Sequence, residues 1–311
     1  MPNILPTETR LRVLAALVDG NSERATERLT GASLKTIRKF ALRLGEGAQH
    51  LHNRLVRDLT CSSVQFDEVW SYIAKKQARV TPNDPPDIGE AYTYVALDTT
   101  SRLAITWHVG RRDEANTRIF MEDLRSRFAA MPSMLTSDGF APYVPAVAES
   151  FGLSVNYGQT VKNYRSRRRR DDDHRYEPPR NPFITKRTIC GSPDLDRAST
   201  SYVERNNGTM RHHIGRMRRL CLAFSKKIEN HRAAVALNYA HYNFCHVVKT
   251  LRVTPAMQAG ITDHIWSLEE FMEAALAAAP TPRPEPQPLQ HPRPEGPARE
   301  LPNGRGFLRL V

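Results

Sequence analysis

The sequence predicts a mixed α/β (α+β) protein, in which a sheet with helices on its faces follows a small helical domain. Apolar residues recur at helical spacing through the first fifty residues. From Ser63 the spacing becomes that of strands, and several strand-like runs follow one another before helical and strand-like segments begin to alternate. The resulting order, β-β-β-α-β-α-β, is typical of a mixed sheet covered by helices.

The first part of the chain, residues 1–58, is predicted to form a helix-turn-helix domain. Thr7 is placed to cap the first helix, Gly20 to end it, and Ser33 to cap the third. Two short helices, a tight turn with glycine and a third helix are the pattern of a helix-turn-helix, whose last helix enters the DNA major groove. The candidate DNA contacts on that helix are Lys35, Thr36, Arg38 and Lys39. The alternative is an amphipathic bundle whose charges are merely solvated.

Residues 59–279 are predicted to form the main domain. Strands are expected over 64–73, 91–98, 103–109, 133–137 and 154–157, the first three as an antiparallel meander. Helices are expected over 114–128, 144–151, 199–220, 225–250 and 266–278. An Arg-rich stretch with prolines, 162–197, is predicted to be a surface insertion, and the proline-rich residues 280–311 a disordered tail.

Composition limits the class of protein. Among 311 residues, 45 Lys or Arg stand against 33 Asp or Glu, and the net charge of +12 indicates a polyanionic partner. No apolar run approaches the roughly 18 to 20 residues of a membrane span, and the start at Met1 has no signal-peptide pattern. The four cysteines lie far apart without a C-x-x-C pair, which argues against a zinc ribbon or a disulfide framework. A cytoplasmic protein without a membrane partner is expected.

Acidic residues stand where metal-dependent phosphodiester chemistry needs carboxylates. Asp67 interrupts the apolar residues of the first strand, where a charge is costly unless it is paired or bound to metal. Asp138 directly follows a short strand, at the carboxyl end where α/β sheets place ligands, and Glu204 lies early in a later helix. Carboxylates from different elements suit Mg²⁺, which prefers oxygen ligands.

Each acid also has an ordinary explanation. Asp67 can be an edge-strand surface residue, Asp138 part of an Asp-Gly turn, and Glu204 an acid that complements a helix dipole. Their joint occurrence with a helix-turn-helix pattern and a high positive charge favours the catalytic interpretation.

Basic residues crowd the Glu204 helix and the segment after it. Arg211 lies two helical turns beyond Glu204 and shares its face. The residues predicted to contact DNA phosphates here are Arg205, Arg211, Arg218 and Lys226. Such contacts make DNA binding strongly dependent on salt.

A family resemblance is carried by segments around the three acids. They are Phe66-Asp67-Glu68-Val69-Trp70-Ser71-Tyr72, Ser137-Asp138-Gly139-Phe140-Ala141-Pro142-Tyr143 and Tyr202-Val203-Glu204-Arg205-Asn206-Asn207, the last followed by Phe224-Ser225-Lys226-Lys227. With Tyr242-Asn243-Phe244 and Thr254-Pro255-Ala256-Met257-Gln258-Ala259-Gly260, they resemble the DDE-type transposases of the bacterial insertion sequence one family over roughly Cys61 to Gly260.

The resemblance implies a ribonuclease-H-like catalytic core that cleaves the ends of a mobile element and joins them to target DNA. Asp67, Asp138 and Glu204 match the family's catalytic, metal-binding residues, with Mg²⁺ as the cofactor and Mn²⁺ as a substitute. The implied partner is double-stranded DNA, both the terminal inverted repeats and the target. A homo-oligomer on DNA is expected, and no nucleotide cofactor.

Two other functions stay open at this point. One is a DNA-binding regulator without catalysis, which should have lost at least one acid, although none is missing here. The other is a ribonuclease-H-like nuclease that cuts DNA without joining it.

Overall fold

The computed structural model describes residues 5–163, 183–218, 222–281, 298–300 and 307–309. Met1–Ala279 form one compact unit and Pro280–Val311 a second. In the second unit, β7 (Ala298–Glu300) and β8 (Phe307–Arg309) pair in antiparallel fashion. The remainder of the predicted disordered tail from residue 282 onward lies outside the described residues.

A mixed six-stranded sheet is the centre of the first unit, with the strand order β3-β2-β1-β4-β5-β6. Its strands are β1 (Ser63–Ile73), β2 (Gly89–Asp98), β3 (Ala104–Gly110), β4 (Met134–Ser137), β5 (Tyr157–Asn163) and β6 (Phe183–Cys190). β1, β2 and β3 form the predicted antiparallel meander, β4 and β5 add in parallel, and β6 returns antiparallel. This mixed sheet with its helices is consistent with a ribonuclease-H-like fold.

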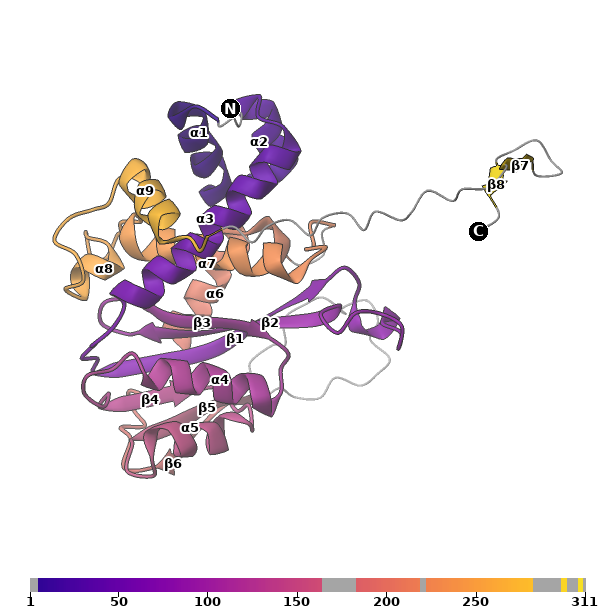
Figure 1. Cartoon of the computed structure of the whole chain (residues 1–311). Coiled ribbons are helices and arrows are strands. Elements are labelled where there is room, and N and C mark those ends of the chain that lie inside the picture. The colour runs from indigo at the N-terminus through magenta and orange to yellow at the C-terminus, as the bar shows by residue number, and fades with distance from the viewer. Residues whose placement is uncertain (1–4, 164–182, 219–221, 282–297, 301–306, 310–311) are drawn as a thin grey trace. The chain divides into compact units, whose positions relative to one another are not determined.

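Helices cover both faces of the sheet (Figure 1). On one face, α4 (Glu114–Arg125) and α5 (Tyr143–Phe151) pack on Phe66 of β1 through buried Phe120 and Tyr143. On the other face lie α6 (Ser201–His213) and α7 (Ile228–Phe244), which pack on Val69 and on the ring of Trp107. Adjacent β1 residues alternate between these two cores because side chains alternate along a strand.

β4 is short, and its end opens the sheet. The last β1–β4 pair is Phe66 with Ser137, and the last β4–β5 pair is Ser137 with Gln159. β1 continues to Ile73 and β5 to Asn163, so both strands run on without β4 between them. We call this place the opening beyond β4. Beyond Phe66, no strand in the described part of the chain pairs with the β4 side of β1, so side chains from both faces of β1 can meet around this edge.

The N-terminal helices follow the predicted order, as α1 (Thr7–Val18), α2 (Glu23–Thr30) and α3 (Leu34–Leu55). Ser33 caps α3, as predicted, by accepting a hydrogen bond from the backbone N–H of Thr36. Thr7 was predicted to cap α1, but it is the first helical residue and Pro6 holds the cap position.

α3 continues through Gly45 and Gly47 to Leu55, beyond the short third helix that the sequence predicts. A Cβ on Gly45 would stand 2.4 Å from the backbone oxygen of Ala233 in α7, and one on Gly47 1.9 Å from that of Ala275 in α9 (Leu268–Ala278). The glycines therefore permit close helix contact, and α1 and α3 share an apolar core with α7 and α9.

Several other boundaries differ from the predictions. The stretch 162–197 was predicted to be an insertion, yet its residues 183–190 form β6, whose backbone pairs with that of β5. The side chains of β6 are mostly exposed, so no buried apolar pattern marks it as a strand. The Arg-rich residues 164–182 lie outside the described part of the chain. α6 ends at His213 and is followed by a 3₁₀ helix, η3 (Gly215–Met217), where one continuous helix was predicted. The shorter pieces η1 (Gln77–Arg79) and α8 (Pro255–Gln258) complete the elements.

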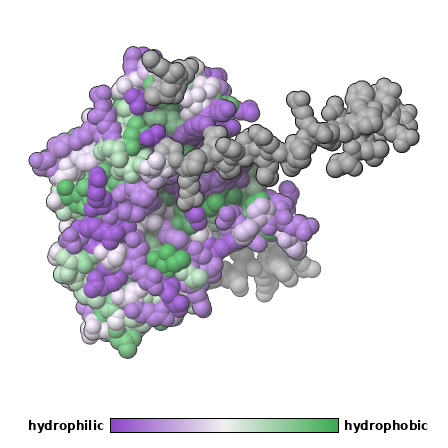
Figure 2. Space-filling view, viewed as in Figure 1, coloured by the Kyte–Doolittle hydropathy of each residue, from purple (hydrophilic) through white to green (hydrophobic). Residues whose placement is uncertain are grey.

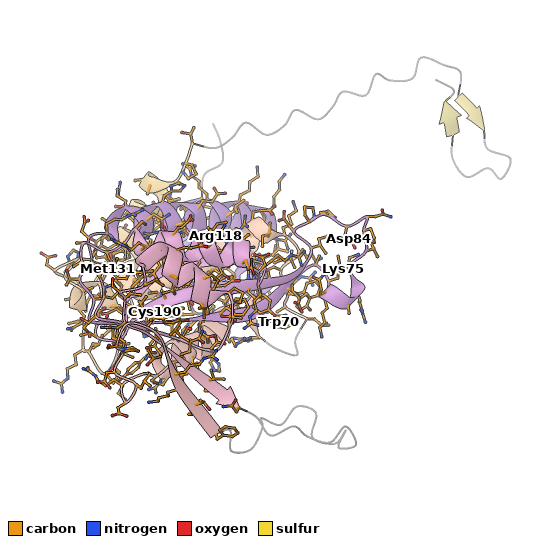
Figure 3. The ribbon with its side chains drawn as sticks, turned by 90° about the horizontal axis from the view of Figure 1, so that it is seen from below. Trp70, Lys75, Asp84, Arg118, Met131 and Cys190 are labelled. Atoms are coloured by element: carbon orange, nitrogen blue, oxygen red, sulfur yellow. The ribbon has the colours of Figure 1, made fainter. Side chains whose placement is uncertain are left out.

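The connection between β1 and β2 projects from the sheet. Lys75 and Asp84 lie side by side at its tip, with 2.6 Å between the lysine nitrogen and a carboxylate oxygen (Figure 3). On the strand leading to it, the rings of Trp70 and Tyr72 are 5.7 Å apart, and Tyr72 stacks on Phe224. β1 therefore carries two partly exposed aromatic rings between Asp67 and the connection.

The visible surface of the first unit is largely polar, with hydrophobic residues in small separate patches (Figure 2). Among the described residues, no helix has the length and apolar character needed to cross a lipid bilayer.

A buried amide on α7 completes the free edge of the sheet. Asn243 accepts a hydrogen bond from the backbone N–H of Ala104 on β3 (3.0 Å) and donates one to its carbonyl oxygen (2.9 Å). His52 of α3 lies 3.1 Å from the same oxygen, and burial lowers the pKa of its imidazole to about 3, which keeps the ring neutral. Asn243 therefore takes the place of a neighbouring strand at this point.

We expect Asn243→Ala to lower the free energy of unfolding by about 1 to 3 kcal/mol, because it leaves the buried backbone N–H of Ala104 without its partner and removes one of the two side chains at the Ala104 carbonyl oxygen. Urea denaturation followed by circular dichroism measures the loss. Asn238→Ala, on the same helix and only partly buried, is the matched control and should stay within about 0.5 kcal/mol of the wild type. Equal effects of the two substitutions would contradict this role of Asn243.

Candidate active site

The predicted acids of the sheet lie at the opening beyond β4. Asp67 is the first β1 residue after the last β1–β4 pair, and Asp138 directly follows the last residue of β4. Glu68, which follows Asp67 on β1, joins them, and one carboxylate oxygen from each of the three residues lies within 4.8 Å of the others. Asp67 and Glu68 point to opposite faces of β1, so they meet across its unpaired edge.

Asp67 faces α6 and is held by Asn207. The amide nitrogen of Asn207 donates to the Asp67 carboxylate over 2.9 Å. Burial, together with the nearby negative charges of Glu68 and Asp138, raises the pKa of Asp67 to about 7. An acid that resists ionisation in this way gains most when a cation approaches it.

Glu68 faces α4 and α5, and its side chain is only 3% exposed. It forms an ion pair with Arg112 and accepts a hydrogen bond of 2.7 Å from the hydroxyl of Tyr143. Burial and the charge of Asp138 raise the pKa of Glu68, and Arg112 opposes that rise. The predicted site did not include Glu68, because from the sequence it is an unremarkable polar strand residue. Its partner Arg112 lies 44 positions further along the chain.

Arg112 also reaches Asp138. Its guanidinium carbon lies 3.9 Å from the centre of the Phe140 ring, and one of its nitrogens is 3.9 Å from an Asp138 oxygen. Asp138 itself accepts a 3.0 Å hydrogen bond from the backbone N–H of Phe140. Burial raises the pKa of Asp138, whereas the Phe140 N–H and Arg112 lower it.

Glu204 lies on α6, whose first turn is fixed to β1 by Gln65. The buried side-chain oxygen of Gln65 accepts hydrogen bonds from the backbone N–H groups of Tyr202 (2.9 Å) and Val203 (3.1 Å). Gln65 stands two residues before Asp67 on the same face of β1, so one strand positions both acids. Gln65 was not among the predicted site residues. A polar residue two positions before Asp67, inside a buried strand, is the feature of the sequence that could have indicated it.

The carboxylate of Glu204 is not part of the close cluster. Thr200 donates to one of its oxygens over 2.7 Å, and the ammonium of Lys162 on β5 contacts both oxygens. Its negative charge nevertheless helps to raise the pKa of Asp67 and Asp138, so it is near them. The structure thus brings two of the three predicted acids together, adds Glu68, and places Glu204 beside them in an ion pair.

The donor set suits a divalent cation. Clustered carboxylate oxygens are the ligands that hard cations such as Mg²⁺ prefer. In addition, the side-chain oxygen of Asn207, next to Asp67, is buried and has no hydrogen-bond partner among the described residues. The residues present therefore fit a metal site.

The predicted DNA contacts of α3 are at the surface of the first unit. Lys35, Arg38 and Lys39 are exposed, and Thr36 is partly exposed with its hydroxyl bonded to Ser33. Arg38 forms an ion pair of 2.7 Å with Glu23, which also binds Arg216 of η3. Glu23 therefore connects α3 to the segment that follows α6.

The basic residues predicted around Glu204 fall into two groups. Arg205 and Lys226 are exposed. Arg211, which is partly buried, and Arg218, which is exposed, close the turn after α6, because Arg211 donates to the backbone oxygen of Met217 (3.0 Å) and Arg218 to that of His212 (2.9 Å). Sequence spacing could not show this, since the helix ends earlier than predicted.

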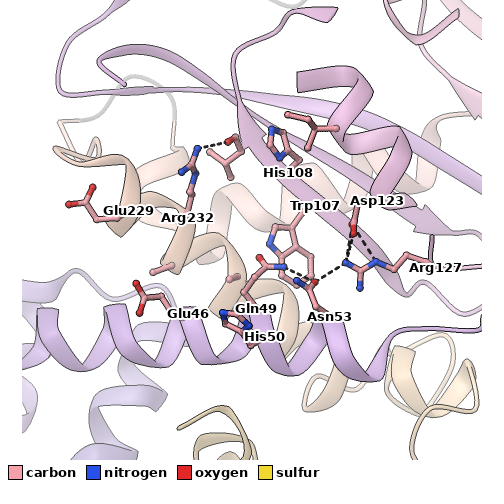
Figure 4. A pocket seen from close by; sticks show the side chains of 15 residues that line it. Glu46, Gln49, His50, Asn53, Trp107, His108, Asp123, Arg127, Glu229 and Arg232 are labelled. Carbon is pink, nitrogen blue, oxygen red and sulfur yellow. Dashed lines mark hydrogen bonds and ion pairs between the residues drawn. The ribbon is translucent and has the colours of Figure 1, made fainter. Parts of the chain in front are cut away.

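A recess of about 640 Å³ lies between α3, β3, α4 and α7 (Figure 4). Of the described residues that line it, none belongs to the carboxylate site. Arg127, on its wall, is 1% exposed and bound to Asp123 and Asn53, both at 2.8 Å. These groups hold α3 to the sheet and α4.

No protein-family model and no curated protein matches the chain. Solved structures of transposase complexes are similar to it at low identity. The piggyBac transposase synaptic complex with hairpin DNA matches with 13% identity and a TM-score of 0.31 over 71% of this chain and 52% of the other, so this chain spans about half its length. The Mos1 transposase paired-end complex with left transposon end has 12% identity and a TM-score of 0.19, over 48% of this chain and 58% of the other. The Mos1 strand transfer complex has 10% identity and a TM-score of 0.21, over 77% of this chain and 78% of the other. This similarity to DNA transposases is remote, so the carboxylate site has to carry any assignment of function.

We expect Asp67→Asn to raise the free energy of unfolding at pH 8, in buffer with a chelator, by about 1 to 3 kcal/mol. The pKa of Asp67 is about 7 in the folded protein, above its ordinary value of 3.8. Between those values the folded protein keeps a proton that the unfolded chain has released, so wild-type stability falls as pH rises through this range. The difference from the variant should vanish below about pH 4, as thermal unfolding at several pH values measures.

Asp84→Asn is the control of opposite sign. Lys75 and Thr81 lower the pKa of Asp84 to about 2, so the folded protein favours its charged form and neutralisation should not stabilise it at pH 8. If Asp67→Asn is less stable than the wild type at pH 8, the claim that repulsion among the neighbouring carboxylates lowers the stability of the folded protein is wrong.

Proposed function

We propose that the chain is a DNA transposase that cleaves the ends of an insertion sequence and joins the freed 3′-hydroxyl to target DNA. The observation that supports it is the cluster of Asp67, Glu68 and Asp138 at the opening beyond β4, with Glu204 beside it on α6. The motifs around these acids support a finer assignment to the bacterial insertion sequence one family.

In this proposal Asp67, Asp138 and Glu204 hold the metal ions, Mg²⁺ or in its place Mn²⁺. When bound, the metal lowers the pKa of the attacking water and stabilises the leaving 3′-oxygen. Asn207 orients Asp67 through its amide, and Gln65 holds the first turn of α6, which carries Glu204.

Arg112 has a separate role. It neutralises Glu68 and lies close to Asp138, so the three neighbouring carboxylates carry less repulsion than their number implies. Its contact with the Phe140 ring fixes the guanidinium in the loop after β4.

One site is sufficient for both chemical steps. Water attacks the phosphodiester at the element end, and one phosphorus–oxygen bond forms as another breaks. The freed 3′-hydroxyl then attacks a target phosphodiester by the same in-line exchange. Because each step breaks one phosphorus–oxygen bond and forms another, neither step needs a nucleotide cofactor.

Double-stranded DNA is the proposed partner, as terminal inverted repeats and as target. α3 supplies Lys35, Thr36, Arg38 and Lys39. We propose that Arg205, Arg211, Arg218 and Lys226 add positive charge on and after the helix that carries Glu204. Both ends of an element must be held together, so we propose that a homo-oligomer forms on DNA.

A strand-transfer assay tests the function. Labelled DNA carrying the element ends, target DNA and Mg²⁺ should yield joined products with the wild type. Asp67→Asn, Asp138→Asn and Glu204→Gln should each lower the rate by about a thousand-fold or more, because each removes a charged metal ligand. Glu149→Gln, which removes an exposed carboxylate on α5 paired with Arg118, should leave the rate unchanged.

The other outcomes separate the alternatives. Cleavage without joining would favour a ribonuclease-H-like nuclease. Binding of end DNA with no cleavage by the wild type would favour a regulator whose acids are structural.

DNA affinity measured against salt concentration tests the proposed contacts. Lys35→Ala and Lys226→Ala should each weaken binding of end DNA and reduce the slope of log affinity against log salt by about 1, since each lysine is proposed to neutralise one phosphate. Fluorescence anisotropy gives both quantities. Lys249→Ala, an exposed lysine in the turn after α7, is the control. An unchanged slope in the first two variants would remove those residues from the DNA-binding surface.

A further inference from the structure

Glu204 is bound by a lysine from the neighbouring side of the opening beyond β4. The ammonium nitrogen of Lys162 lies 2.6 Å from one oxygen of Glu204 and 2.5 Å from the other. The two side chains are 34% and 36% exposed. Both oxygens of Glu204 are thus engaged by one positive charge that retains access to solvent.

The topology accounts for this contact. β5 pairs with β4 only as far as Gln159, and Lys162 lies beyond that point. It occupies on β5 the kind of position that Asp67 occupies on β1, past the end of the short central strand. The charge of Lys162 also acts on Asp138. Lys162 is therefore close both to Glu204 and to the acid at the end of β4.

The two cations of the site are held differently. Arg112 is bound to Glu68, which is 3% exposed, and contacts the Phe140 ring, so it has a fixed place. Lys162 is a single charge on a flexible chain, and such a group can leave a carboxylate for solvent at little cost. A metal ion that binds Glu204 competes with the ammonium, because both cations are drawn to the same two oxygens and repel each other.

We propose that Lys162 competes with a divalent cation for Glu204, and so determines the metal concentration at which Glu204 joins Asp67 and Asp138. Lys162 is in this sense a positioning residue, because it acts through Glu204. The inference rests on the proposed function in so far as Glu204 is a metal ligand. It accounts for the place of Glu204 outside the close cluster of the other three acids.

Mn²⁺ binding to the full chain without DNA, measured by isothermal titration calorimetry, tests the inference. Lys162→Met should bind Mn²⁺ about ten-fold more tightly than the wild type, the lower end of what one adjacent charge does to a carboxylate. Lys186→Met is the matched control, because Lys186 lies on β6 and, among the described residues, donates to the backbone oxygens of Leu195 and Asp196 and not to an acid of the site. Its affinity should equal that of the wild type.

A double-variant cycle separates competition at Glu204 from a general loss of positive charge. In a Glu204→Gln background, the gain in Mn²⁺ affinity from Lys162→Met should fall to a small remainder due to the charge of Lys162 on Asp138, since the carboxylate for which the two cations compete is gone. An equal gain in that background would overturn the inference. So would unchanged or weaker binding by Lys162→Met alone, or no Mn²⁺ binding by any of these proteins. Lys162→Gln gives a second neutral variant should Lys162→Met fail to fold.

The result is independent of strand transfer. Tighter Mn²⁺ binding by Lys162→Met together with absence of joined products in the wild type would retain the competition and reject the transposase. Joined products from the wild type, together with unchanged Mn²⁺ affinity of Lys162→Met, would retain the transposase and reject the competition.

Discussion

Repulsion between carboxylates placed at the end of one short strand is the constraint on which the rest of the structure depends. Asp67, Glu68 and Asp138 lie within 4.8 Å of one another where β4 stops, and burial makes their charges more costly. The surrounding groups offset that cost. Arg112 and Tyr143 hold Glu68 on one face of the sheet, Asn207 holds Asp67 on the other, and a backbone N–H holds Asp138. Such an arrangement costs stability and is retained where it serves binding or catalysis.

The two halves of the site depend on different parts of the fold. β1 and β4 place the cluster through regular strand pairing, so its geometry follows from the register Phe66 with Ser137. Glu204 comes from a helix whose first turn is connected to the sheet by Gln65, and its carboxylate is bound by Thr200 and Lys162. The side chain of Glu204 is 36% exposed, whereas that of Glu68 is 3% exposed. The acid that Lys162 binds is therefore open to solvent, unlike the acid that Arg112 binds.

The sequence was sufficient to predict those elements that depend on the local pattern of apolar and polar residues. Alternating apolar residues predicted β1 to β3, and the short apolar run before Asp138 predicted β4, so two acids of the site were placed correctly on their elements. Contacts between distant residues were not predictable. Glu68 depends on Arg112, and Glu204 on Lys162, which lies in a stretch whose charge and prolines indicated an insertion. Glycine is a poor helix former, and no local pattern shows that contact with Ala233 makes Gly45 necessary inside α3. The functional roles of the acids and of the N-terminal helices stay predictions.

α3 is a single helix of 22 residues, about 33 Å long. Its second half contacts α7 and α9 through Gly45 and Gly47, and His52 near its end lies against β3. Lys35 and Thr36 in its first turn therefore have a fixed position relative to the sheet. Under the proposed function, with a duplex bound at that turn and its reacting phosphodiester at Asp67, the length of α3 sets the number of base pairs between the two. One additional base pair would rotate that phosphodiester by about 35° about the duplex axis.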